Sequence, residues 1–99
     1  MIRGTTPTLS FRLPFDTNTL KKFYITFNQN EKTILEKTAE DCILKGNVIS
    51  LNLTQEETLV FAPKGNVKIQ IRAKTLLDEA IASNIIITTV GDILKDGEI

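Results

Sequence analysis

The stretch Val67-Lys68-Ile69-Gln70-Ile71-Arg72-Ala73-Lys74 decides the fold class of this chain, because apolar and polar residues alternate through it without a break. Successive side chains of a strand point to opposite faces of its sheet, so this period of two predicts a half-buried strand. The apolar residues would face a core, and Lys68, Gln70, Arg72 and Lys74 would face water. Strands with one wet face are typical of antiparallel sheets, so the stretch predicts an antiparallel β protein.

Shorter segments repeat this alternation along the chain, and residues that favour turns separate them. Six or seven short strands at roughly ten-residue spacing are typical of a β-sandwich. Strands are expected near residues 8–13, 23–27, 33–37, 41–44, 48–53, 67–74 and 80–90.

Two short helical turns are expected between these strands. Asp16 can cap a turn that ends near Leu20, and Thr54 and Glu57 match the capping box of a turn that ends near Leu59. A strand, a capped turn and another strand resemble the corner between the fifth and sixth strands of immunoglobulin-like domains, although the corner tyrosine, the cysteine pair and the core tryptophan are absent. We therefore predict an all-β, immunoglobulin-like antiparallel β-sandwich, with a small closed barrel as the alternative.

Length and charge limit the classes of protein that the chain can belong to. Its 99 residues predict a single domain over 1–99. Twelve basic and twelve acidic residues give a net charge of zero, so no overall field attracts nucleic acid or an anionic membrane, and neither is expected as a partner. No apolar run approaches the ~20 residues of a spanning helix, and the start lacks the apolar stretch of a secretory signal. The expectation is a soluble protein made in a cytosol.

The residues needed for catalysis are scarce. The chain has no histidine, and Cys42 is its one cysteine. The neighbouring Glu40 and Asp41 would raise the pKa of the Cys42 thiol, which favours a small buried side chain over a nucleophile. The remaining carboxylate pairs lie side by side in turns and not across a cleft, as acid–base catalysis would need. We expect a protein that is not an enzyme and has no catalytic residue, cofactor or metal.

Two surface features each allow two interpretations. Ile85-Ile86-Ile87 is apolar on both faces, so it is either a central strand covered on both sides, which is favoured, or an edge covered by a partner subunit. The basic side of residues 68–74 is interpreted as a solvated face or a protected edge. The alternative is a surface for single-stranded nucleic acid, for which Tyr24 would be one possible stacking ring.

Both ends of the chain are expected to lie outside the sandwich. Residues 1–7 are polar at Arg3-Gly4-Thr5-Thr6 and predict a flexible N-terminal arm that becomes ordered on assembly. Residues 92–99 predict a surface tail, in which Ile93 and Leu94 could pack back against the core.

A resemblance to a known family covers nearly the whole chain. The opening Arg3-Gly4-Thr5-Thr6-Pro7-Thr8, followed by Phe11-x-Leu13-Pro14-Phe15-Asp16, resembles a small family carried by phages and prophages of Firmicutes. The similarity continues through residues 53–59, 67–72 and 82–85 and closes at 90–94. This family has no established enzymatic activity, so no catalytic residue is carried over. In the order of its elements, the chain is also similar to the N-terminal β-sandwich of phage upper-baseplate proteins.

The resemblance implies a non-enzymatic structural or assembly protein near the phage tail or baseplate. Its partners would be other phage structural proteins or further copies of itself, in the host bacterial cytoplasm during assembly and, as an open alternative, in the virion. An exposed strand edge could offer a place for an added strand. The alternative function is a receptor- or carbohydrate-binding adsorption module, for which a chain without tryptophan is poorly supplied. The expected contact residues are Arg3, Thr5, Thr6, Lys68 and Arg72.

Overall fold

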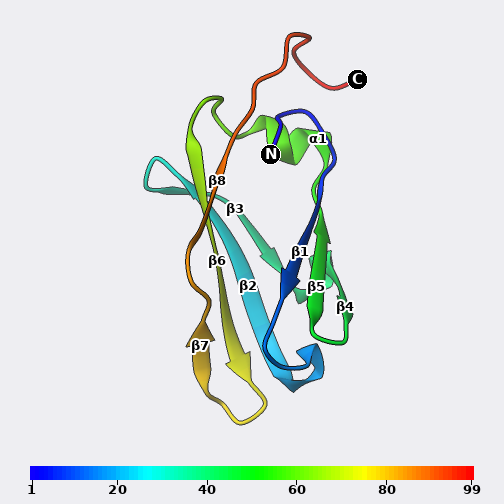
Figure 1. Ribbon diagram of the computed structural model, residues 1–99, viewed down its shortest axis with the longest axis vertical. Coiled ribbons are helices and arrows are strands. Elements are labelled where there is room, and N and C mark those ends of the chain that lie inside the picture. The colour runs from blue at the N-terminus through cyan, green and yellow to red at the C-terminus, as the bar shows by residue number, and fades with distance from the viewer.

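Two antiparallel sheets packed face to face form the protein in the computed structural model, which describes residues 1–99 (Figure 1). The smaller sheet has the order β1-β5-β4, with β1 (Thr8–Arg12), β5 (Val48–Asn52) and β4 (Cys42–Lys45). The larger sheet has the order β3-β2-β6-β7, with β3 (Lys32–Thr38), β2 (Leu20–Gln29), β6 (Asn66–Thr75) and β7 (Ala80–Ala82); β8 (Ile86–Thr89) also pairs with β6. The predicted all-β sandwich is confirmed.

The core lies between the sheets and is built from the inward faces that the alternation predicted. On β2 and β6 the residues that pair directly, such as Ile25 with Ile71 and Phe27 with Ile69, point to the same side and are buried. The ring of Phe27 packs at 6.0 Å, centroid to centroid, from that of Phe61, which follows the helix. The buried apolar residues are Phe11, Phe23, Ile25, Phe27, Ile49, Leu51, Leu53, Phe61, Val67, Ile69, Ile71 and Val90.

Short helical segments connect the strands where the caps predicted them. Asp16 accepts a hydrogen bond from the backbone of Asn18 at 3.0 Å and opens η1 (Thr17–Thr19). The capping box opens α1 (Gln55–Leu59): the Thr54 hydroxyl accepts from the Glu57 amide at 3.1 Å, and the Glu57 carboxylate accepts from the Thr54 amide at 2.9 Å. A third segment, η2 (Ala39–Asp41), carries the chain from the larger sheet to the smaller one.

The prediction of one continuous strand over residues 80–90 is wrong. This segment forms two strands, β7 and β8, so the protein has eight strands in total. Ser83 is the physical reason for the break. Its backbone amide donates to the Ile71 carbonyl at 2.8 Å, but the Ile71 amide donates to the Ser83 hydroxyl at 3.0 Å instead of to a carbonyl. A side-chain oxygen thus takes the place of a backbone oxygen, and the ladder with β6 resumes at Ile86.

The interpretation of Ile85-Ile86-Ile87 as a central, covered strand is also wrong. β8 pairs with β6 on one side and has no strand on the other. The three isoleucines are 56%, 45% and 60% exposed. They therefore form an apolar sheet edge, as in the second interpretation.

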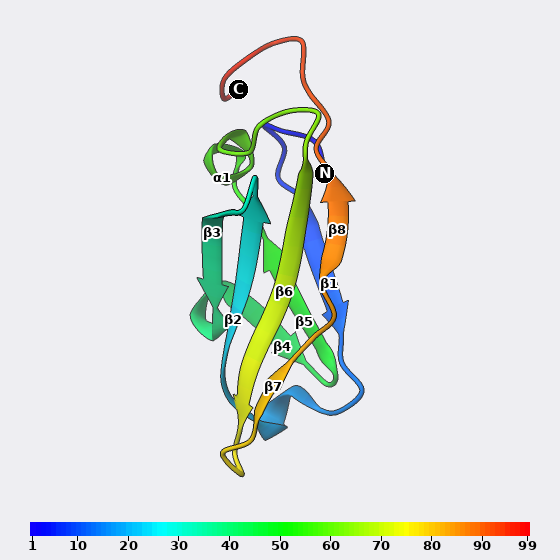
Figure 2. The same ribbon diagram turned by 90° about the vertical axis from the view of Figure 1, so that its left-hand side faces the viewer.

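One strand position of the immunoglobulin-like sandwich is empty in this protein. Immunoglobulin-like sandwiches pair strands A, B, E and D in one sheet and C, F and G in the other. Here β1-β5-β4 corresponds to B-E-D, and β3-β2-β6-β8 corresponds to an extended C-F-G sheet, so no strand stands in the position of A. Figure 2 shows β1 and β8 at the same side of the molecule. One parallel bridge, between Ile2 and Gly91, lies at one end of this side.

No helix in the structure is both long enough and apolar enough to cross a membrane.

Candidate binding surfaces

Arg3, an expected contact residue, is held by contacts within the chain. Its Nε donates to the Phe61 carbonyl at 2.8 Å, and one Nη donates to the Leu59 carbonyl at 3.2 Å. The other Nη forms an ion pair with Asp92 at 3.2 Å, and the Arg3 side chain is 17% exposed. The guanidinium therefore covers the carboxyl end of α1, where carbonyls lack helical partners and a positive charge is favourable.

The rest of the N-terminal segment also lies against the body of the protein, in contrast to the flexible arm that was expected. The Met1 amino group donates to Thr89 at 3.0 Å, and the Gly91 amide donates to Met1 at 2.7 Å. The Thr58 hydroxyl, which is buried, donates to the Thr5 carbonyl at 2.9 Å. Sequence periodicity gave no sign of this docking because backbone groups make most of these contacts. The side chains of Thr5 and Thr6 remain exposed beside α1.

The C-terminal tail follows its prediction in part. Ile93 lies over Gly4, so close that a β-carbon on Gly4 would meet the Ile93 Cδ1 at 2.9 Å. Leu94, which was expected to dock as well, is fully exposed. The last residue, Ile99, is joined through its backbone to the side-chain amide of Gln55.

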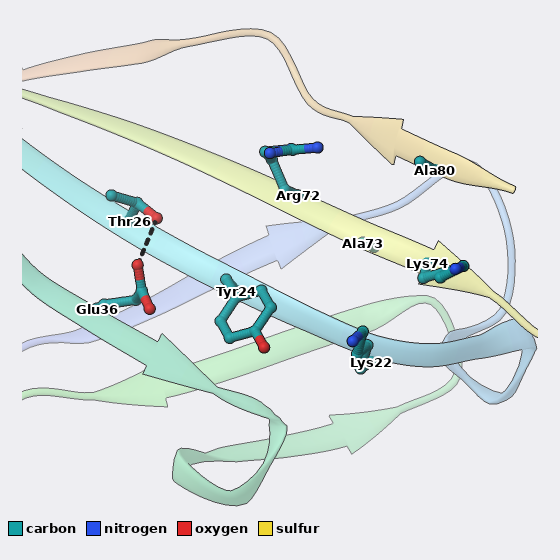
Figure 3. Close-up of a pocket in the computed structure, with 8 residues that line it drawn as sticks. All are labelled: Lys22, Tyr24, Thr26, Glu36, Arg72, Ala73, Lys74 and Ala80. Carbon is teal, nitrogen blue, oxygen red and sulfur yellow. Dashed lines mark hydrogen bonds between the residues drawn. The ribbon is translucent and has the colours of Figure 1, made fainter. Parts of the chain in front are cut away.

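Lys68 and Arg72, the remaining expected contact residues, lie on the outer face of the larger sheet. Lys74 lies on the same face of β6, and β2 adds Lys22, directly opposite Lys74, and Tyr24, directly opposite Arg72. We call these five residues the basic face: Lys22, Tyr24, Lys68, Arg72 and Lys74. A groove of about 470 Å³ runs over most of it (Figure 3). Its lining is Lys22, Tyr24, Thr26, Glu36, Arg72, Ala73, Lys74 and Ala80.

The charges of the basic face have no ionic partners within the chain. The cations that form salt bridges are Arg3, Lys21 and Lys37, none of which lies on this face. One carboxylate, that of Glu36, stands at the end of the groove and accepts a long, 3.5 Å hydrogen bond from Thr26 (Figure 3). Tyr24 is 41% exposed between these charges. This surface can attract an anionic group and place an aromatic ring against it.

The open side of the sandwich carries an apolar cleft in two parts. Both parts reach the core strand β6, and no charged side chain lines either of them. The part between β1 and β8 has a volume of about 340 Å³ and is lined by Met1, Pro7, Thr8, Leu9, Ser10, Phe11, Ile69, Ile86 and Thr88. The part beside β7 has a volume of about 410 Å³ and is lined by Leu13, Pro14, Phe15, Leu20, Ile71, Ala73, Ile81, Ala82, Ser83 and Asn84.

The groups considered for catalysis lie apart from these surfaces. Cys42 is half-buried on β4, and burial raises the pKa of its thiol; the Asp41 carboxylate raises it further, while Lys37 lowers it. A thiol with a raised pKa is a poor nucleophile at neutral pH. No group of three or more acidic or cysteine side chains is placed to hold a metal ion.

Two features of these surfaces, the position of Lys22 and the cleft, could not be predicted from the sequence. Lys22 follows Lys21 at the start of a strand, and its position opposite Lys74 depends on how two distant strands align. The cleft depends on which strands are neighbours in three dimensions. The uncharged run Ile85-Ile86-Ile87 was the one signal for the edge, but it suits a buried strand equally well.

No family model, no curated protein and no solved structure matches this chain.

Proposed function

We propose that the chain is a non-enzymatic, phage-derived structural or assembly protein, associated with the tail or baseplate, that acts through protein–protein contacts. The observation that carries the proposal is the open side of the sandwich, where β1 pairs only with β5, β8 pairs only with β6, and a cleft without charged side chains lies between them. The phage setting is supported by the similarity of the Arg3–Thr8 opening and of the later segments to proteins of phages and prophages.

An unprotected strand edge is unusual in a protein that acts alone. Natural proteins protect edge strands with charged residues, prolines or bulges, because a free edge pairs with other chains. β8 and the residue before it read Ile85-Ile86-Ile87-Thr88-Thr89 and have none of these features. Three half-exposed isoleucines add an apolar area whose burial would stabilise a complex by ~1 kcal/mol or more for each side chain. This edge is therefore built to be covered.

The partner that fits the open side is an extended strand of another subunit. Such a strand would pair its backbone with the free edge of β1 or β8 and place alternate apolar side chains in the cleft. It would occupy the position of strand A in the immunoglobulin-like order, where this chain has the single bridge between Ile2 and Gly91. Uncharged lining requires that the inserted side chains be uncharged too.

The proposal is tested in cells that produce the phage. The chain should sediment in complexes larger than its own 11.1 kDa and, if it is structural, should occur in purified particles at a fixed copy number measured by mass spectrometry. Ile86→Lys places a charge in the cleft, which Ile86 lines, and should return the chain to the size of a monomer. Leu77→Lys is the matched control, since Leu77 is 82% exposed in a turn away from the cleft.

Three results would overturn the proposal. One is a wild-type chain that sediments as a monomer throughout infection and is absent from particles. Another is an Ile86→Lys chain that stays in the complexes as fully as the Leu77→Lys chain. The third is an enzymatic activity of the purified chain that accounts for its role.

A further inference from the structure

Lys22 and Lys74 face each other across β2 and β6, although like charges directly opposite one another destabilise a sheet. Neither lysine forms a salt bridge that would offset the repulsion. Sequences are locally consistent with their folds except where function requires otherwise. Two facing lysines without ionic partners are what a site for an anionic ligand would need.

The rest of the basic face extends this charge into a stripe. Residues two apart on one strand point to the same side about 7 Å apart, so Lys68, Arg72 and Lys74 span roughly 20 Å along β6. Tyr24 lies opposite Arg72 near the middle. Tyrosine and arginine are the residue types that contribute most often to the hot spots of protein interfaces. Length, charge and residue types together describe a surface for an extended anionic chain.

We propose that the basic face binds an extended acidic segment of a partner protein. Carboxylates on such a segment would complement the cations of this face, and the Arg72 guanidinium can bond one of them in a bidentate manner. Because Glu36 stands at one end of the groove, the carboxylates should lie mainly over Lys22, Arg72 and Lys74 (Figure 3).

The observations favour an acidic peptide over nucleic acid. Proteins that bind single strands stack successive bases on several rings, whereas this face carries the one ring of Tyr24. The net charge of zero also gives no long-range attraction for a polyanion as highly charged as nucleic acid. A protein segment with a few carboxylates matches a local stripe of four cations more closely.

This inference goes beyond the strand contact proposed above, and either can hold without the other. The open side lies at the edge of the sheet and is uncharged, whereas the basic face is the outer surface of the same sheet. The variant Ile86→Lys separates them, because it should block the strand contact. Since Ile86 pairs with Ile69 and lines the cleft, the added charge should leave binding of an acidic peptide unchanged.

The experiment uses a labelled twelve-residue peptide of alternating Glu and Ser, titrated with the full chain and followed by fluorescence anisotropy at low and at physiological salt. The double variant Lys22→Gln/Lys74→Gln should raise the Kd at least tenfold, and Arg72→Gln should raise it severalfold. The matched control Lys45→Gln/Lys95→Gln removes two exposed lysines from other surfaces and should change the Kd less than twofold. Higher salt should weaken binding to the wild-type chain.

Three outcomes would overturn the inference. The first is no binding of the Glu–Ser peptide at millimolar protein, or equal binding of a Gln–Ser peptide. The second is an equal loss of binding in the control variant. The third is tenfold tighter binding of a thymidine oligonucleotide of the same length, which would assign the face to nucleic acid. Circular dichroism of each variant establishes that a loss of binding is not a loss of fold.

Discussion

The side-chain amide of Gln29 and the backbone of Ala62 are joined by two hydrogen bonds inside the protein. The Gln29 Nε2 donates to the Ala62 carbonyl at 2.8 Å, and the Ala62 amide donates to the Gln29 Oε1 at 2.7 Å. Gln29 is 4% exposed. This contact ties the end of β2 to the loop that follows α1, so it fixes how the helix sits on the sandwich.

We expect Gln29→Ala to lower the free energy of unfolding by about 2–4 kcal/mol, because it leaves two backbone groups without partners where water has little access. Gln55 supplies a matched control, since its amide makes the same reciprocal pair with the backbone of Ile99 at the surface. Gln55→Ala should cost less than about 1 kcal/mol. Urea unfolding measures both, and equal losses would show that burial does not set the value of the Gln29 contact.

We expect Arg3 to stabilise the folded protein through the shape of its guanidinium more than through its charge. Arg3→Lys keeps the charge but cannot reach the carbonyls of Leu59 and Phe61 and the carboxylate of Asp92 together, so we expect a loss of about 1–3 kcal/mol. Asp92→Asn removes only the charge of the ion pair. Because the Asp92 side chain is 46% exposed, this change should cost less than about 1 kcal/mol. Thermal unfolding separates the two; a larger loss for Asp92→Asn would mean that charge dominates.

The ion pair of Lys37 with Glu57 links β3 to α1 and should make stability depend on pH. Burial alone would raise the pKa of Glu57, but hydrogen bonds from Lys37 and Thr54 outweigh it, and the pKa lies below its usual value of 4.5. A lowered pKa in the folded state stabilises the protein above the unfolded-state value, and this contribution is lost as pH falls through the folded-state value.

Glu57→Gln keeps the cap but removes the charge, so it should cost about 0.5–1 kcal/mol at pH 7. The difference from wild type should shrink as the pH falls below 4.5 and vanish at more acidic pH. Urea unfolding at a series of pH values measures this. A difference that stays constant from pH 7 to pH 3 would rule out the ion pair as its cause.

The repulsion between Lys22 and Lys74 should lower the free energy of unfolding, while their charges favour binding of the acidic peptide. Lys22→Glu replaces a like-charge pair with an opposite-charge pair, so we expect the free energy of unfolding to rise by about 0.2–1 kcal/mol. The same change should abolish binding of the acidic peptide described above. If stability falls while binding persists, the repulsion between the two lysines has no role in a site.

Local patterns in the sequence were sufficient for the strands and their inward faces. The alternation at residues 67–74 identified Val67, Ile69 and Ile71 as core, and the Thr54–Glu57 box located α1. These features depend on neighbours in sequence, which a single chain displays directly.

Features that depend on distant contacts could not be predicted in this way. The break at Ser83 arises because one hydroxyl competes with a carbonyl for the Ile71 amide, and composition gives no sign of it. The docking of residues 1–7 depends on carbonyls exposed at the end of α1. The position of Lys22 opposite Lys74 requires the register of two strands that are about fifty residues apart in the chain.

The most direct measurement of the central claim is site-specific photo-crosslinking in cells that produce the phage. A photoreactive amino acid replaces Ile86, which lines the cleft, or Leu77, which does not. We predict that position 86 crosslinks to one phage structural protein, or to a second copy of this chain, and that position 77 does not. The claim would be contradicted if position 86 gave no crosslink, or if both positions crosslinked to the same proteins with the same yield.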